Sequence, residues 1–234
     1  MYNPQASELR RLFYSDEFLV LPGIYDALTA KIAEKVGFNC LVMGGYSIAA
    51  SKLGQPDVGY LTMTEMAQAV KTICDAVQIP LMADGDTGYG NALSVRRTVL
   101  EYERAGASAI LFEDQAWPKR CGHMQGKEVI SAEEHADKIK AAVEARTNPD
   151  TVIIARTDSR AVLGLEEAIR RGRQYFAAGA DALFIEAPQD ENELAEIGRA
   201  FPGKVLLANM IEGGKTPILT PTQLQKLGFR VVFW

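Results

Sequence analysis

The chain has 234 residues, of which 47% are hydrophobic and 24% charged, and its formal net charge is −5. This length suits a globular protein with a sizeable core, and the lack of a lysine- or arginine-rich run argues against a nucleic-acid partner. No apolar stretch approaches the roughly 20 residues that cross a bilayer, and the N-terminus lacks the apolar segment of a secretory signal, so we expect no membrane partner.

Short apolar runs recur along the chain, and helical patterns separate most of them. The apolar runs are Phe18–Leu21, Cys40–Met43, Ile79–Ala83, Ser108–Phe112, Val152–Ala155, Ala182–Ile185, Val205–Ala208 and Val231–Trp234. The helical patterns cover Asp26–Val36, Thr62–Ala76, Ala92–Ala105, Ser131–Ala145 and Leu165–Ala178. Because the runs are continuously apolar rather than alternating, they predict parallel strands that are covered on both faces.

Strand-then-helix units of this kind predict an α/β fold, a (β/α)8 TIM-type barrel that forms a single catalytic domain over residues 1–234. A doubly wound open sheet is the alternative, but the Gly-rich dinucleotide loop that would follow its first strand is absent. The chain stops within the predicted eighth strand, so we expect a C-terminally incomplete barrel that lacks its last helices. Either the sequence is a piece of a longer chain, or a partner subunit helps to close the barrel.

The cysteines indicate a reducing compartment. Cys40, Cys74 and Cys121 are odd in number and have unrelated spacings, which argues against a disulfide framework. We therefore expect a cytoplasmic protein. Cys40 and Cys74 lie in apolar surroundings and are predicted to be core residues. His135 lies in a helical stretch and is interpreted as a structural surface residue.

Polar residues follow the apolar runs at the point where each predicted strand ends, which is where barrel enzymes have their active sites. These residues are Gly44, Gly45, Tyr46, Asp84, Asp86, Glu113, Arg156, Asp158, Glu186 and Asn209. Several neighbouring strands that each end in an acid predict a catalytic mouth. Ordinary solvated loops are the alternative.

The segment Asp84–Gly90, with the sequence DGDTGYG, is the most specific of these strand ends. The carboxylates of Asp84 and Asp86 can converge with that of Glu113, at the end of the next strand, on one hard cation. Ligands that are all oxygen favour Mg²⁺, or Mn²⁺ as a second possibility. An Asp/Gly turn without a metal is the alternative.

A polar stretch after the fourth predicted strand contains Lys119-Arg120-Cys121-Gly122-His123. A cysteine beside basic residues would have its thiolate favoured, which suits proton transfer or nucleophilic attack. A loop here could fold over the mouth and exclude water. An exposed thiol in a basic loop is the alternative.

Arg156 comes directly after an apolar run and must find an anion. A bidentate contact with a substrate carboxylate is one use of this side chain. A structural ion pair with Glu186 or Asp158 is the other.

The stretches DGDTGYGN, FEDQ, PKRCGH, IIARTD and ANMIEGGKTP resemble the isocitrate lyase/phosphoenolpyruvate mutase superfamily, in register from about Leu21 to the last residue. This resemblance implies a (β/α)8 barrel in a homodimer or homotetramer whose last helix is swapped between subunits. It also implies a small carboxylic acid as substrate and Mg²⁺ as cofactor.

The resemblance also assigns roles to individual residues. Metal ligation, often through water, is implied for Asp84, Asp86, Asp57 and Glu113. Substrate binding is implied for Gly44, Gly45, Tyr46, Gly122, Arg156, Glu186 and Asn209. A catalytic role is implied for Cys121, as the general acid, and for Lys119 and His123, which lie in the same gating loop.

The implied reaction is a retro-Claisen-type cleavage of a substituted 2-hydroxy acid, such as 2,3-dimethylmalate or 2-methylisocitrate, to a 2-keto acid and a carboxylic acid. Cys121 would protonate the enolate carbon. Pro217 favours a lyase, because the superfamily's oxaloacetate hydrolases carry serine there. Val42 and Gly44 depart from the methylisocitrate lyases.

Three alternatives stay open: a carboxyphosphonoenolpyruvate or phosphoenolpyruvate mutase, an oxaloacetate hydrolase or decarboxylase, and a non-catalytic barrel that binds keto acids.

Overall fold

The eight apolar runs form one parallel sheet in the computed structural model, which describes residues 3–122, 124 and 126–234. Its strands are β1 (Leu19–Leu21), β2 (Gly23–Ile24), β3 (Leu41–Met43), β4 (Leu81–Asp84), β5 (Ala109–Glu113), β6 (Val152–Thr157), β7 (Ala182–Ile185), β8 (Val205–Asn209) and β9 (Val231–Phe233). Each pairs with the next strand of the order β1-β9-β8-β7-β6-β5-β4-β3-β2.

The first predicted strand, Phe18–Leu21, corresponds to β1, and a short strand that was not predicted, β2, follows it; the two together close the barrel. Pro22 separates the two strands and has no N–H to donate to a neighbouring strand. β1 pairs with the last strand, with Leu19 opposite Val231, while β2 pairs with β3, with Gly23 opposite Val42. The sheet therefore returns to its starting strand, and the predicted TIM-type barrel is confirmed.

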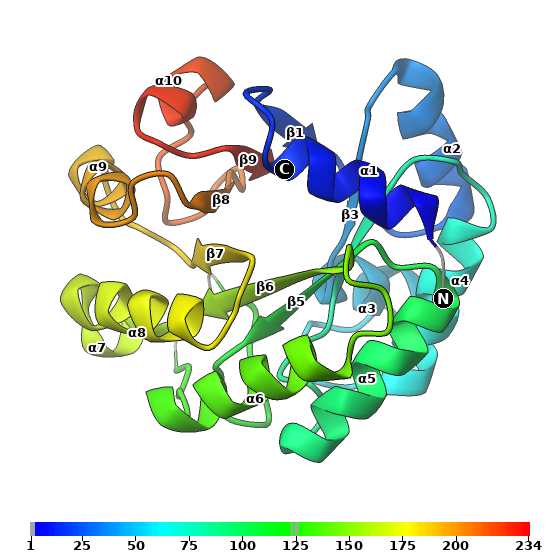
Figure 1. Ribbon diagram of the computed structural model, residues 1–234, viewed down its shortest axis with the longest axis horizontal. Coiled ribbons are helices and arrows are strands. Elements are labelled where there is room, and N and C mark those ends of the chain that lie inside the picture. The colour runs from blue at the N-terminus through cyan, green and yellow to red at the C-terminus, as the bar shows by residue number, and fades with distance from the viewer. Residues whose placement is uncertain (1–2, 123, 125) are drawn as a thin grey trace.

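Helices surround this sheet (Figure 1). They are α1 (Pro4–Phe13), α2 (Ala27–Val36), α3 (Gly45–Leu53), α4 (Met63–Cys74), α5 (Ala92–Ala105), α6 (Ala132–Ala145), α7 (Ser159–Leu163), α8 (Leu165–Ala177), α9 (Glu191–Ala200) and α10 (Pro221–Lys226). The five helical patterns correspond to α2, α4, α5, α6 and α8. The sequence did not reveal α3, because its opening glycines are typical of a turn and its N-cap Gly44 makes no side-chain capping bond.

Apolar side chains fill the barrel interior as well as the space between the sheet and the helices. Inside the barrel, Met82, Leu111 and Phe184 belong to the same cluster as Leu9 and Phe13 of α1. Helix α1 lies across one end of the barrel in Figure 1. This end is closed by packing, so a substrate would enter from the opposite end, where the strands have their carboxyl termini.

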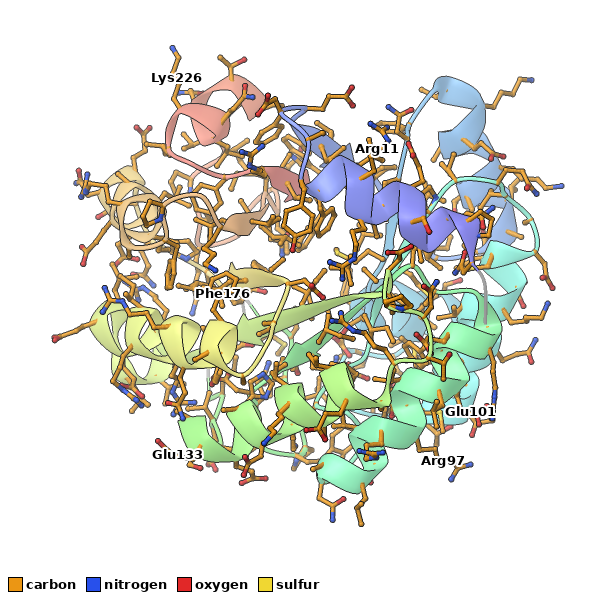
Figure 2. All side chains as sticks on the ribbon, viewed as in Figure 1. Arg11, Arg97, Glu101, Glu133, Phe176 and Lys226 are labelled. Carbon is orange, nitrogen blue, oxygen red and sulfur yellow. The ribbon has the colours of Figure 1, made fainter. Side chains whose placement is uncertain are left out.

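Charged side chains project from the outer faces of the helices, as Figure 2 shows for Arg97, Glu133 and Lys226. None of the helices in the described part of the chain is both long enough and apolar enough to cross a membrane.

His135 is not a surface residue, and the interpretation from the sequence was wrong. It is completely buried on α6, where its ring meets the edge of the Tyr175 ring with 4.6 Å between centroids. Burial, together with the nearby charges of Lys138 and Arg171, lowers the pKa of His135 to about 3. A histidine in a charged helix looks exposed in sequence, but here the helix turns it toward the sheet.

This burial predicts a loss of stability in acid. Between its unfolded pKa of 6.5 and its folded pKa of about 3, His135 binds a proton only in the unfolded chain. The free energy of unfolding should therefore fall as the pH drops below 6.5, by about 2 kcal/mol at pH 5 from this group. Denaturant unfolding at pH 5 and 7 should show a smaller pH dependence in His135→Phe. Equal dependence in both proteins would contradict the assignment.

Candidate active site

A cavity of about 340 Å³ opens at the carboxyl ends of the strands. Of the residues singled out from the sequence, those that line it are Gly44, Gly45, Tyr46, Asp57, Asp84, Cys121, Gly122, Arg156, Glu186 and Asn209. Its apolar wall consists of Val42, Met43, Met82, Leu111, Phe184, Ile211 and Phe233. The cavity therefore combines an apolar wall with a few convergent polar groups, as small-molecule sites usually do.

Asp84 and Asp86 are held by the turn that follows β4. The carboxylate of Asp84 accepts a hydrogen bond from the Asp86 amide at 2.9 Å and another from the Gly45 amide at 2.9 Å. Asp86 has a φ of 49°, which is uncommon for a residue with a side chain. A Cβ atom on Gly45 would lie 3.1 Å from Asp86 Oδ1 and 3.3 Å from Asp84 Oδ2. The two carboxylates thus converge where only a glycine leaves them room.

Lys119 lies among these acids rather than in the open cavity. Its Nζ atom is 2.7 Å from Asp57 Oδ1 and also pairs with Asp86. Burial works against a charged Lys119, but Asp86, Glu113 and the other carboxylates raise its pKa well above the usual value. Burial also raises the pKa of Asp86 to about 6, against the opposing effect of Lys119.

Arg156 reaches three carboxylates at the ends of β5, β6 and β7. Its Nε is 2.9 Å from Asp158 Oδ2, its NH1 is 3.3 Å from Glu113 Oε2, and its NH2 is 3.1 Å from Glu186 Oε2. The guanidinium also stacks over the Phe184 ring, 5.4 Å from the centroid. The structural ion pairs with Asp158 and Glu186 are present, and Arg156 also lines the cavity; its contact with a substrate carboxylate stays a prediction.

The acids fit a metal ion in their chemistry, although their present arrangement does not form a ligand cluster. No group of three or more His, Cys, Asp or Glu is placed to hold a metal within the described residues. However, Asp86 Oδ1 and Glu113 Oε2 are buried against the cations of Lys119 and Arg156, and the buried Glu113 Oε1 accepts no hydrogen bond from any residue that the structure describes. Burial raises the pKa of Glu113 well above its usual value. A buried carboxylate oxygen without a donor, such as Glu113 Oε1, suits a cation or its bound water.

The loop after β5 brings Cys121 and Gly122 to the cavity wall. A side chain at position 122 would collide with the Glu186 carboxylate and the Arg156 guanidinium. The loop can therefore approach the strand ends this closely only with a glycine at this position. The predicted catalytic residue His123 lies outside the described residues.

The remaining predicted substrate contacts stand at the rim of the cavity. Gly44 is the N-cap of α3, Gly45 is its first residue and donates its amide to Asp84, and Tyr46 is 62% exposed. Helix N-termini favour anions such as carboxylates. Pro217, which served to distinguish lyases from hydrolases, is not among the lining residues of the cavity.

A buried network behind the cavity was missed from the sequence. Asp114 accepts hydrogen bonds from Arg171 at 2.9 Å, from Tyr175 at 2.8 Å and from the Asp158 amide at 2.8 Å. Lys127 pairs with Asp158 at 2.6 Å. Asp114 could have been predicted to belong to the site, because it follows directly after a predicted strand. Lys127 lies in a polar stretch whose sequence pattern gives no indication of its burial.

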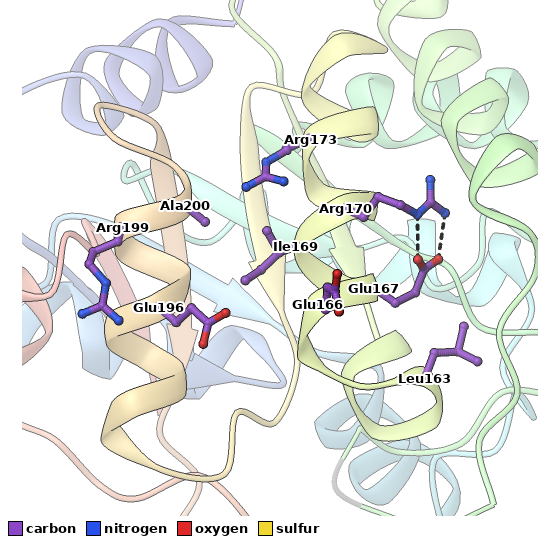
Figure 3. Close-up of a pocket in the computed structure, with 9 residues that line it drawn as sticks. All are labelled: Leu163, Glu166, Glu167, Ile169, Arg170, Arg173, Glu196, Arg199 and Ala200. Carbon is purple, nitrogen blue, oxygen red and sulfur yellow. Dashed lines mark hydrogen bonds and ion pairs between the residues drawn. The ribbon is translucent and has the colours of Figure 1, made fainter.

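A second hollow, of about 580 Å³, lies on the outside of the barrel between α8 and α9 (Figure 3). Charged side chains of both signs line this hollow. Among them, Arg170 Nε donates a hydrogen bond to Glu167 Oε2 at 2.6 Å. These side chains are mostly exposed and do not converge on one point. We therefore place the active site in the smaller cavity, at the strand ends.

The sequence is similar to several enzymes of known name. The profile of the family described as phosphoenolpyruvate phosphomutase matches residues 9–234. The 2,3-dimethylmalate lyase of Eubacterium barkeri is 50% identical over 98% of this chain and 79% of its own length. The chloroplastic carboxyvinyl-carboxyphosphonate phosphorylmutase of Arabidopsis thaliana is 48% identical over 99% of this chain and 70% of its own length. A 2-methylisocitrate lyase of Aeropyrum pernix is 45% identical over 97% of this chain and 72% of its own length.

Solved structures give the same picture. A crystal structure of 2,3-dimethylmalate lyase superposes with a TM-score of 0.95 at 39% identity, over 100% of this chain and 79% of that one. Oxaloacetate acetylhydrolase with 3,3-difluorooxalacetate has a TM-score of 0.95 at 38% identity (100% and 80%). Phosphonopyruvate hydrolase with oxalate and Mg²⁺ has a TM-score of 0.86 at 35% identity (98% and 80%).

Proposed function

This chain belongs to the phosphoenolpyruvate phosphomutase family, within the isocitrate lyase/phosphoenolpyruvate mutase superfamily, and from that premise we propose that it is a magnesium-dependent carbon–carbon lyase. Its substrate would be a substituted 2-hydroxy dicarboxylic acid of the 2,3-dimethylmalate type. The products would be a 2-keto acid and a carboxylic acid. We also retain residues 1–234 as one catalytic domain.

The observation that carries the proposal is the convergence of acids and cations on one apolar-walled cavity. Asp84 and Asp86 meet over Gly45 on one side, while Arg156 and Cys121 stand on the other. To cleave a hydroxy acid, an enzyme needs oxygen ligands that hold a metal ion and a cationic side chain that binds the substrate carboxylate. It also needs a proton donor near the carbon of the departing enolate. The described residues supply each of these groups.

The residues of the chain have separate tasks in this proposal. Asp84 and Asp86, with Asp57 and Glu113, would hold Mg²⁺, which supplies charge stabilisation to the substrate oxygens when bound. Arg156 and the amides at the start of α3 would orient a substrate carboxylate. A base would remove the proton of the substrate hydroxyl, and the bond between the hydroxyl-bearing carbon and its neighbour would break. Cys121 would then give its proton to that neighbouring enolate carbon, which becomes part of the carboxylic acid product.

The cavity wall favours an alkyl-substituted dicarboxylate over the alternatives. Arg156 is the one cationic side chain among the described lining residues, and three carboxylates already contact it. A transferring phosphoryl group, or a third carboxylate, would need further positive charge. Leu111, Phe184 and Phe233 instead offer apolar surface that methyl groups can cover.

A substrate panel tests the function. The protein is incubated with Mg²⁺ and 2,3-dimethylmalate, 2-methylisocitrate, isocitrate, oxaloacetate or phosphonopyruvate, and released 2-keto acid is coupled to a dehydrogenase. We expect the fastest turnover with 2,3-dimethylmalate. Turnover of phosphonopyruvate or oxaloacetate alone would overturn the lyase proposal.

Metal removal should abolish turnover in the same assay. EDTA should stop the reaction and added Mg²⁺ should restore it, because the substrate oxygens would lose their charge partner. Asp84→Ala should lose both turnover and the heat of Mg²⁺ binding in calorimetry. Asp75→Ala, an exposed residue paired with Lys71, serves as the control and should behave like wild type. Turnover that persists in EDTA would exclude the metal.

We retain the homo-oligomer, a dimer or tetramer, as a prediction. Leu28, Ile32 and Val36 are 67%, 53% and 71% exposed and stand one helical turn apart on α2, so they form an apolar stripe that a second subunit would cover. Light scattering of the purified protein gives the mass directly. The cytoplasmic location likewise remains a prediction.

A further inference from the structure

A buried lysine behind the cavity joins the loop that carries Cys121 to the strand that carries Arg156. The side chain of Lys127 is 1% exposed. Its Nζ atom donates a hydrogen bond to the Gly122 carbonyl and lies 2.6 Å from Asp158 Oδ1. A lysine is rarely buried without specific partners, so these two contacts account for its position.

Asp158 is a fixed anchor for this lysine. Its carboxylate pairs with Arg156 at 2.9 and 3.1 Å, through Nε and NH2. Its backbone amide donates to Asp114, whose carboxylate also accepts from Arg171 and Tyr175. These bonds fix Asp158 at the end of β6. Lys127 therefore ties the loop that carries Cys121 to a rigid part of the barrel.

The other side of the loop is equally constrained. Gly122 stands against Arg156 and Glu186 so closely that a Cβ atom would collide with both. The Gly122 carbonyl accepts a hydrogen bond from Lys127 Nζ, and Cys121 is the residue just before Gly122. The place of this carbonyl therefore decides where the thiol stands at the cavity wall.

We propose that Lys127 is a positioning residue, which bridges the Gly122 carbonyl and Asp158 and so holds Cys121 at the cavity wall beside Arg156. The inference rests on the proposed function, because it gives Cys121 a reaction to perform. Lys127 is not among the residues that line the cavity, so it acts through the loop and not on the substrate.

The test compares Lys127→Met with wild type in the full chain. Methionine keeps much of the length and removes the charge and the hydrogen bonds. We expect kcat/KM for the lyase substrate to fall about 10- to 100-fold, mostly in kcat, because a displaced catalytic group is costly. We also expect iodoacetamide to alkylate Cys121 about 10-fold faster. At pH 10, above the ordinary thiol pKa of about 8.5, this rate reports access to the thiol rather than its ionisation.

Arg146→Met is the matched control for a general loss of stability. Arg146 pairs with Asp181 at 2.8 Å, before β7 and therefore at the closed end of the barrel. This variant should keep the wild-type alkylation rate of Cys121, which peptide mass spectrometry separates from Cys40 and Cys74. A kcat/KM within twofold of the control, or a Cys121 alkylation rate equal to that of the control, would each overturn the inference.

The role of Cys121 in the proposed function and the positioning role of Lys127 are tested by separate outcomes. If Cys121→Ala keeps full turnover, Cys121 is not the acid, yet the alkylation rate still decides whether Lys127 holds the loop. If Cys121→Ala is inactive and Lys127→Met behaves like the control, the acid stands and the positioning role falls.

Discussion

Replacing Cys121 with alanine should lower kcat by about 10²- to 10⁴-fold and leave the substrate dissociation constant within a few-fold of wild type. Cys121 lines the cavity together with Arg156 and Glu186. A methyl group cannot deliver a proton to the carbon that leaves as an enolate. Asp84 and Asp86, which are proposed to hold Mg²⁺, remain in place in this variant. The Arg156 guanidinium, which is proposed to orient a substrate carboxylate, also remains.

Steady-state kinetics and calorimetric binding of the substrate to the inactive variant separate the two quantities. Cys74→Ala is the control, because Cys74 ends α4 and packs against Gly106, away from the strand ends that form the cavity. It should keep wild-type kcat. If Cys121→Ala turned over as fast as Cys74→Ala, another group would have to donate the proton.

Replacing Arg156 with methionine should lower the free energy of unfolding by about 3–5 kcal/mol, because it leaves buried carboxylates without their cation. Glu113 has no other partner among the described side chains at hydrogen-bond distance, and its side chain is 1% exposed. Asp158 keeps Lys127. The variant should also lose at least about 100-fold in kcat/KM, because the guanidinium is the proposed carboxylate contact.

The stability loss in Arg156→Met should depend on pH. Without the guanidinium, the pKa of Glu113, already raised by burial, rises further in the folded protein. A folded pKa above the unfolded one means that the folded state takes up the proton first, so stability is retained at low pH and lost as the pH rises. The difference from wild type should therefore be larger at pH 8 than at pH 5. Taking this difference cancels the opposite trend expected from His135.

Two further variants check the cause. Arg160→Met removes an arginine of α7 that pairs with Glu193 at 2.8 Å outside the cavity, and it should cost about 1 kcal/mol or less. Arg156→Met with Glu186→Gln should be more stable than Arg156→Met alone, because one of the buried charges that faced the guanidinium is neutralised. An Arg156→Met protein as stable as Arg160→Met at every pH would contradict the charge network.

The positions of the strands followed from the sequence because their signal is local. A run such as Ala182–Ile185 is apolar on both faces only where helices and the barrel interior cover it, and it was predicted with the bounds that the structure has. The polar residues directly after such runs must stand at one end of the barrel. All seven residues predicted to bind substrate line the cavity.

The partners of these residues did not follow from the sequence. Lys119 was predicted as a catalytic loop residue, and its ion pairs with Asp57 and Asp86 cross from one strand end to others. The burial of His135 and the contacts of Lys127 are of the same kind. Apart from the Lys127–Gly122 bond within one loop, these contacts join residues that are far apart along the chain.

The sequence by itself thus determined the barrel, the end at which the site opens and the residue types found there, because strand period and burial are properties of short segments. The pairing of the strands decided which charge meets which. Because β5 pairs with β6, with Glu113 opposite Arg156, and β6 pairs with β7, Arg156, Glu113 and Glu186 come together in one buried network although they are far apart in sequence. Such distances depend on the packing of the whole barrel, which no local pattern contains.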